Sequence, residues 1–139
     1  MSDLPVASEQ RGGVLHLTLN RPDKRNAMSL AMVETLINEL DAAANNETIR
    51  AIVIRGAGGH FCAGGDISDM AQARQAAMAG NAESFQQMNR LFGTLLTKVN
   101  EQPQTVVCVT EGAVLGGGMG LACVADITLS ALEAKFGLP

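Results

Sequence analysis

Aromatic residues are scarce in this chain, which has four Phe among its 139 residues and neither Trp nor Tyr. Proteins that bind single-stranded nucleic acid stack its bases on aromatic side chains, and few are available here. A basic excess is also absent, because ten Lys and Arg stand against fourteen Asp and Glu, for a net charge of −4. Nucleic-acid-binding domains usually carry a basic stripe. We therefore expect no nucleic-acid partner.

Long apolar runs and metal-binding patterns are missing as well. No stretch of about 18 apolar residues is present, so no membrane span is expected. The first ten residues have neither the basic start nor the apolar stretch of a signal peptide. The three cysteines, Cys62, Cys108 and Cys123, lack metal-ligand spacing, and an odd number favours reduced thiols over disulfides. We expect a cytoplasmic protein without a metal site.

The hydrophobic pattern predicts a single α/β domain, since 139 residues with 47% hydrophobic content can bury one core. Alternation of Leu15, Leu17 and Leu19 indicates a half-buried strand, and Ser29 is placed to cap the helix after it. Strands are expected at 14–19, 51–55, 106–109 and 127–129, with a further strand within 134–139. Helices are expected at 30–44, 67–80, 85–99 and 121–125, with a break near 80–81.

Two glycine-rich loops, 61–66 and 116–120, are the most informative local feature. Each follows a short apolar strand and leads toward a helix. Glycines let a ligand approach the backbone, and two converging N–H groups can stabilise an oxyanion without a charged side chain. The N–H groups of Ala63 and Gly117 are the donors that we expect. The alternative is that these glycines only form tight turns.

Five motifs in this order resemble the enoyl-CoA hydratase/isomerase (crotonase) family, from about Val14 to the end. They are Asn20-Arg21-Pro22 with Asn26-Ala27, then Phe61-Cys62-Ala63-Gly64-Gly65-Asp66-Ile67, Gly116-Gly117-Gly118, Ala125-Asp126-Ile127 and Lys135-Phe136-Gly137-Leu138-Pro139. The resemblance implies a crotonase-like spiral of repeated ββα units. Members of the family are longer, so residues 1–139 resemble a truncated N-terminal spiral-core portion whose C-terminal part is absent.

The resemblance also implies an acyl-CoA substrate, no separate cofactor, and a homotrimer or hexamer for the complete protein. Ala63 and Gly117 would supply the oxyanion hole. Lys24 or Arg25 would meet CoA phosphates, unless they are ordinary solvated loop charges, and Asp66 would cap the next segment rather than act as a base. The implied substrate-binding residues are Lys24, Arg25, Ala27, Ala63, Gly64, Gly65, Asp66, Ile67, Gly116 and Gly120.

One departure from the family pattern leaves the reaction open. Hydratases of the family use two glutamates, of which the first aligns with Gly120 and the second would follow Pro139. The most plausible reaction is hydration of an enoyl-CoA, with little activity expected from these 139 residues alone, and Glu111 is the least implausible substitute acid. Gly120 would widen the pocket for a branched or carboxylated acyl group, as in hydratases resembling those for methylglutaconyl-CoA and isohexenylglutaconyl-CoA. The alternatives are an isomerase, a decarboxylase, a thioester hydrolase or a non-catalytic CoA-binding module.

Overall fold

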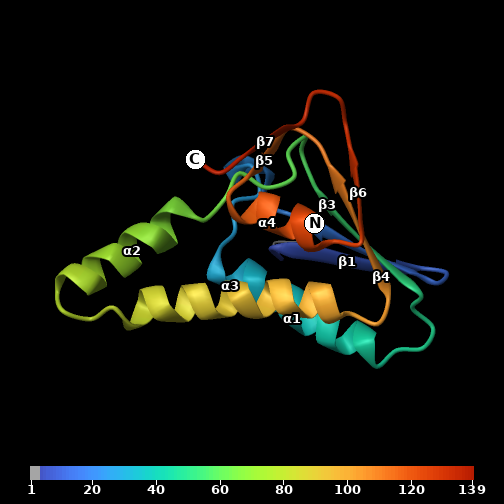
Figure 1. Cartoon of the computed structure of the whole chain (residues 1–139), viewed down its shortest axis with the longest axis horizontal. Helices are drawn as coiled ribbons and strands as arrows, with labels where there is room; N and C mark the ends of the chain where they lie inside the picture. The colour runs from blue at the N-terminus through green and yellow to red at the C-terminus, as the bar shows by residue number, and fades with distance from the viewer. Residues whose placement is uncertain (1–3) are drawn as a thin grey trace.

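A five-stranded sheet forms the frame of the computed structural model, which describes residues 4–139 (Figure 1). Its strands, in spatial order, are β1 (Val6–Arg11), β2 (Val14–Leu19), β3 (Ala51–Gly56), β4 (Thr105–Thr110) and β6 (Ile127–Ser130). The first pair is antiparallel and the other three pairs are parallel. A second, parallel sheet joins β5 (Ala113–Leu115) to β7 (Lys135–Gly137).

Four helices connect these strands: α1 (Leu30–Ala44), α2 (Ile67–Met78), α3 (Glu83–Glu101) and α4 (Gly117–Val124). Helices α1 and α3 run alongside each other below the sheet in Figure 1, and α4 lies between α3 and the second sheet. Helix α2 and the first half of α3 reach away from the sheet as an arm, which we call the α2–α3 arm (residues 67–92). No helix in the described part of the chain is long and apolar enough to cross a bilayer.

The core lies between one face of the large sheet and the helices. Leu15, Leu17 and Leu19 of β2 are buried, and the parallel register places the first two beside the buried residues Ile52 and Ile54 of β3. Period-two burial of this kind follows from the alternation of side chains along a strand. The helices contribute their apolar faces to the same cluster, namely Met32, Val33, Leu36 and Leu40 of α1, Leu95 and Val99 of α3, and Leu121 and Ala122 of α4.

Most of the expected elements are confirmed. The Ser29 hydroxyl accepts the Met32 N–H at the start of α1, and Gly80, with φ of +92°, ends the turn that follows α2. Strands 51–56, 105–110 and 127–130 lie within a residue or two of their predicted bounds. The order β1-β2-α1 recurs as β4-β5-α4, so the predicted α/β class with ββα units is confirmed.

Two strands and one helix start were not foreseen. Strand β1 is mostly exposed and β5 has three residues, so neither carries a readable apolar pattern. Helix α4 begins at Gly117, four residues before the predicted Leu121. The prediction missed this start because three glycines occupy the first turn of the helix. Close packing explains why a glycine stands in this turn: a Cβ atom at Gly118 would lie 2.7 Å from both the Cβ and the carbonyl oxygen of Cys62.

Replacing two glycines of the same helix tests this explanation. Alanine gains about 1 kcal/mol of helix propensity over glycine, but Gly118→Ala must displace the Cys62 backbone. We expect Gly118→Ala to lower the free energy of unfolding by about 2 kcal/mol or more. At Gly120→Ala the nearest atom is at the edge of the Phe92 ring, at 3.3 Å, and the variant should stay within about 1 kcal/mol of the wild type. Urea unfolding of both variants measures the difference, and equal stabilities would contradict the packing argument.

Candidate active site

Backbone hydrogen bonds join the two glycine loops. The Phe61 N–H donates to the Glu111 carbonyl over 2.9 Å, and the Cys62 N–H donates to the Ala113 carbonyl over 3.0 Å. The Leu115 N–H returns a bond to the Cys62 carbonyl over 2.9 Å. The first loop thus lies beside β5, and the second loop follows directly from that strand.

The buried side chain of Asn26 connects a third loop, residues 20–27, to the same region. Its Oδ1 accepts the Arg21 N–H over 2.7 Å, while its Nδ2 donates to the carbonyls of Ala57 and His60 over 2.9 and 2.8 Å. Asn26 is fully buried and has φ of +58°, a left-handed conformation that Asn adopts more readily than most residues. One side chain therefore fixes the distance between this loop and the segment that leads into the first glycine loop.

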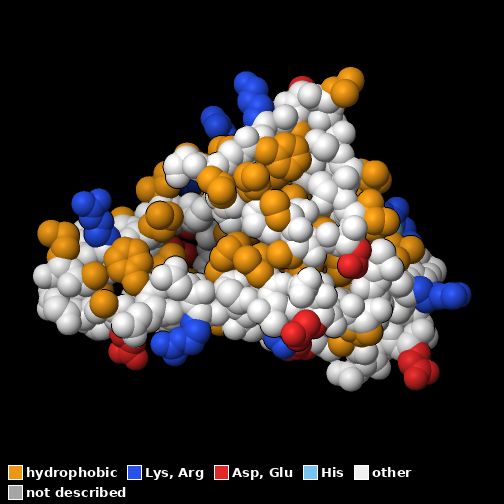
Figure 2. All heavy atoms as spheres, viewed as in Figure 1, with side chains coloured by type: hydrophobic (Ala, Val, Ile, Leu, Met, Phe, Trp, Pro, Cys, Tyr) orange, Lys and Arg blue, Asp and Glu red, His pale blue; other side chains and the backbone are white. Residues whose placement is uncertain are grey.

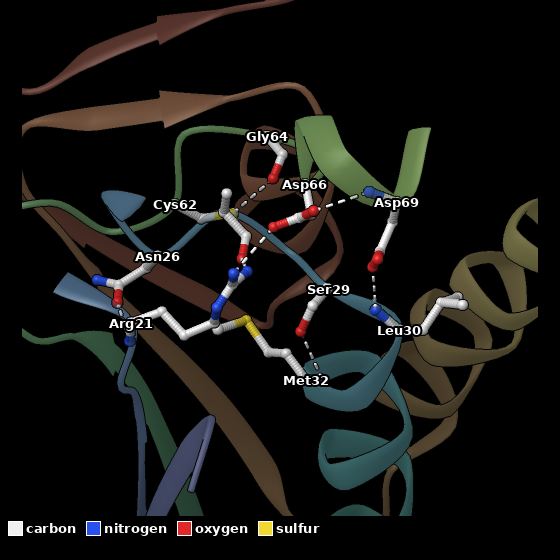
Figure 3. Close-up of polar contacts among 10 residues, drawn as sticks. Arg21, Asn26, Ser29, Leu30, Met32, Cys62, Gly64, Asp66 and Asp69 are labelled. Atoms are coloured by element: carbon white, nitrogen blue, oxygen red, sulfur yellow. Dashed lines mark hydrogen bonds and ion pairs between the residues drawn. The ribbon is translucent and has the colours of Figure 1, made fainter. Parts of the chain in front are cut away.

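Arg21 and Asp66 make the polar link between these loops (Figure 3). The guanidinium contacts the Asp66 carboxylate at 2.9 Å and also donates to the Ala27 carbonyl over 2.6 Å. The other carboxylate oxygen accepts the Asp69 N–H and caps α2, which confirms the capping role expected for Asp66. Burial by itself raises the pKa of Asp66, but N–H donors of Asp69 and Ser68 together with Arg21 outweigh burial and hold it below its ordinary value.

Two cavities meet at these loops. An apolar cavity of about 260 Å³ opens between α4 and the α2–α3 arm, where Figure 2 shows hydrophobic side chains around a hollow. It is lined by Met28, Ser29, Leu30, Val33, Gly65, Met70, Phe85, Met88, Asn89, Phe92 and Gly117. A polar cavity of about 700 Å³ is lined by Arg21, Asp23, Lys24, Arg25, Ala27, Ser29, Ala63, Gly65, Asp66, Ile67, Ser68 and Asp69. Gly65 and Ser29 border both, so the two cavities are neighbours.

The predicted site residues divide between these cavities. Seven of them line the polar cavity, namely Lys24, Arg25, Ala27, Ala63, Gly65, Asp66 and Ile67. Gly117 lines the apolar cavity, and Gly64, Gly116 and Gly120 are absent from both linings. The apolar wall, with Met70, Phe85, Met88 and Phe92, was not predicted as part of the site. Their helical spacing on α2 and α3 was the signal available, but it is also the spacing of ordinary core residues.

The predicted oxyanion donor Ala63 needs correction. Its N–H donates to the Arg25 carbonyl over 3.0 Å and is therefore occupied. The N–H groups of Gly65 and Gly117, by contrast, have no hydrogen-bond partner within residues 4–139. Both of these residues border the apolar cavity. The available pair of donors is thus Gly65 with Gly117.

The expected widening of the pocket at Gly120 stays a prediction. A Cβ atom at this position would lie 3.3 Å from Cζ and 3.6 Å from Cε2 of Phe92, and 3.8 Å from Leu96 Cδ1. The ring from α3 therefore borders the space into which a side chain at position 120 would extend.

Two of the three cysteines, Cys62 and Cys108, are buried, whereas Cys123 is exposed. Cys62 is fully buried, and burial raises the pKa of its thiol despite nearby hydrogen bonds. Burial likewise raises the pKa of Cys108 to about 12, so neither thiol forms a thiolate readily at neutral pH. Within the described residues, no group of three His, Cys, Asp or Glu side chains is placed to hold a metal ion.

Comparison with protein families gives a match over residues 9–139 to the model described as enoyl-CoA hydratase/isomerase. The chain belongs to this family. A curated relative, 2,3-dehydroadipyl-CoA hydratase of Escherichia coli, is 37% identical over the whole chain and half of its own length. The 1,2-epoxyphenylacetyl-CoA isomerase of the same organism is 33% identical over 94% of this chain and 49% of its own.

A solved structure, Pseudomonas aeruginosa AtuE, supports the same membership. It is 54% identical and superposes with a TM-score of 0.91 over 97% of this chain and 51% of its own. The crotonase-like fold expected from the motifs is therefore confirmed. The chain spans about half the length of the curated relatives it matches.

The Arg21–Asp66 pair predicts a pH-dependent stability. Because the pKa of Asp66 is lowered by folding, its carboxylate stabilises the fold above the ordinary Asp pKa of about 3.9, and this contribution is lost as pH falls through the lowered value. Asp66→Asn keeps a capping side chain but loses the ion pair. We expect it to be less stable by about 1–3 kcal/mol at pH 7, with the difference shrinking toward about pH 3.

Urea unfolding across this pH range measures the effect. Asp23→Asn is the control, because Asp23 is an exposed carboxylate of the same cavity and takes part in none of the ion pairs within residues 4–139. A destabilisation of Asp66→Asn that stays constant with pH would refute the ion-pair explanation.

Proposed function

We propose that this chain binds an acyl-CoA thioester with its carbonyl oxygen between the N–H groups of Gly65 and Gly117. The observation that carries the proposal is the position of these two unpartnered donors beside one cavity. Gly65 also borders the polar cavity. A thioester held there would extend its CoA part into the polar cavity and its acyl part into the apolar one.

The proposed reaction is hydration of an enoyl-CoA. Addition of a water oxygen to the β-carbon pushes the electron pair of the double bond toward the thioester, and the carbonyl oxygen becomes an enolate oxyanion. Two N–H donors fixed by the fold stabilise that charge, and loss of one such donor typically costs about 3–4 kcal/mol of activation free energy. The attacking water gives up one proton to a base, and a proton delivered to the α-carbon restores the thioester, so that OH and H have been added across the double bond.

The charges of the polar cavity fit the CoA part. Lys24 and Arg25 line this cavity, and neither takes part in an ion pair within residues 4–139. Arg21, in contrast, is committed to Asp66. Two available cations in a polar cavity suit phosphate groups, which supports the role of Lys24 and Arg25 in binding the phosphates of CoA.

The proton-transfer groups for hydration are not among the residues that line the apolar cavity, since none of them is Asp, Glu or His. In the polar cavity, Asp66 pairs with Arg21, and the Asp69 carboxylate accepts the Leu30 N–H over 3.0 Å. Glu111 lines neither cavity. Backbone stabilisation of the enolate without a placed acid or base leaves the proton transfers of hydration without a catalytic group.

We therefore expect the 139-residue chain alone to hydrate an enoyl-CoA far more slowly than the usual enzymatic range of about 1–1,000 per second. Loss of absorbance by the conjugated thioester of crotonyl-CoA measures the rate. A turnover within that range would contradict the need for a further acid or base. Product analysis on the same samples distinguishes hydration from double-bond isomerisation, which requires the same enolate and is the second candidate reaction.

The donor assignment has its own prediction. An ester in place of the amide at Gly65 replaces the N–H with an oxygen atom and adds no side chain. Polarisation by N–H donors lowers the stretching frequency of a carbonyl group, so the bound, ¹³C-labelled thioester of crotonyl-CoA should show a smaller infrared shift in this ester variant. The same result is expected for an ester at Gly117.

An ester at Ala63 is the matched control, because its N–H donates to the Arg25 carbonyl. It lies in the same loop and removes one N–H in the same way. The infrared shift should remain close to that of the unmodified chain. A shift lost with the ester at Ala63 and kept with the ester at Gly65 would return the assignment to Ala63 and refute the proposed pair.

A further inference from the structure

Two side chains of the α2–α3 arm stand against the two donor glycines. A Cβ atom at Gly65 would lie 2.9 Å from the Met70 sulfur, and a Cβ atom at Gly117 would lie 3.2 Å from both Cε1 and Cζ of Phe92. Met70 belongs to α2 and Phe92 to α3. Met70 and Phe92 also line the apolar cavity beside these glycines, so an acyl group that enters this cavity would contact both side chains.

Phe92 has a second contact that ties it to the unusual glycine of α4. The same ring lies 3.3 Å from the position of a Cβ atom at Gly120. The glycines at 117 and 120, one helical turn apart, leave room for the aromatic ring on this face of α4. Phe92 thus lines the apolar cavity and also borders the space that a side chain at position 120 would enter.

The polarity of the residues that line the apolar cavity limits which acyl groups the cavity can bind. None of its lining residues is charged, and the only side chains with polar atoms for hydrogen bonding are Ser29 and Asn89. The Ser29 hydroxyl already accepts the Met32 N–H. Moving a carboxylate from water into such surroundings, without a cation to pair with, is strongly unfavourable.

We propose that Phe92 and Met70 are the specificity-determining residues of this site, and that they select an uncharged, apolar acyl group over a carboxylated one. The inference rests on the proposed function, because it assumes that a thioester lies between Gly65 and Gly117. Of the branched and carboxylated acyl groups expected from the sequence, it disfavours the carboxylated ones. Branching is compatible with it, since Met70 is 48% exposed and a methionine side chain adapts to irregular shapes.

The first experiment compares two thioesters of equal chain length. Calorimetry measures the affinity of the chain for octanoyl-CoA, for its ω-carboxylated counterpart and for CoA itself. We expect octanoyl-CoA to bind at least tenfold more tightly than the carboxylated thioester. Equal or tighter binding of the carboxylated thioester would overturn the inference.

The second experiment tests the two residues. Phe92→Ala and Met70→Ala should each lower the ratio of octanoyl-CoA to CoA affinity by about three- to tenfold, with CoA affinity unchanged. Phe92→Leu keeps an apolar side chain on α3 and serves if the alanine variant fails to fold; it should lower the same ratio by a smaller factor. An unchanged ratio in a folded Phe92 variant would overturn the role of the ring.

Matched controls come from the same residue types outside the cavity. Met78 lies on α2 and is 80% exposed, and Phe136 lies on β7 and is 44% exposed. Met78→Ala and Phe136→Ala should leave the ratio unchanged, and an equal fall in these variants would overturn the inference. Failure of CoA and all thioesters to bind would overturn the proposed function together with the inference, whereas binding without any preference would overturn the inference alone.

Discussion

The arrangement of the candidate site depends on the three hydrogen bonds of one buried side chain, Asn26. They connect the backbone of Arg21 to the carbonyls of Ala57 and His60, which lie just before the first glycine loop. A buried amide that lost these partners would leave several backbone groups unsatisfied, at about 1–3 kcal/mol each. The position of the loop that carries Lys24 and Arg25 is therefore tightly linked to the position of the glycine loop.

This link also determines which backbone donors are available to a ligand. Arg25 and Asn26 both have left-handed φ values, of 50° and 58°. In that conformation the Arg25 carbonyl accepts the Ala63 N–H, while the Met28 N–H donates to the Gly64 carbonyl and the Asp66 N–H donates to the Met28 carbonyl. Gly65, between the last two bonds, keeps an unpartnered N–H within the described chain. The loop that carries Arg25 thus determines which N–H groups of the first glycine loop are engaged within the described chain.

The sequence predicted those parts whose residue types carry the relevant signal. Alternating leucines placed β2, and Ser29 placed the start of α1, because side-chain period and capping chemistry are local properties. The same motifs predicted the family and the capping role of Asp66. Each of these depends on residues close together in the chain or on a recognisable motif.

The parts that were missed depend on contacts between distant segments. Ala63 and Gly65 both offer an N–H in the same glycine-rich loop, and only the position of the Arg25 carbonyl distinguishes them. Gly120 indicated added space, but Phe92, 28 positions earlier, borders that space in the folded chain. Residue types at one position therefore do not reveal which distant group its backbone meets.

The glycines of α4 show how this site conflicts with local preference. Glycine is less favourable than alanine in a helix by about 1 kcal/mol, yet Gly117, Gly118 and Gly120 fall within its first four positions. Gly118 is needed for the approach of Cys62, while Gly117 and Gly120 accommodate the Phe92 ring. The first turn of a helix also leaves N–H groups without intrahelical partners. A helix start that is unfavourable by propensity thus presents the Gly117 N–H, unpartnered within residues 4–139, beside an apolar cavity.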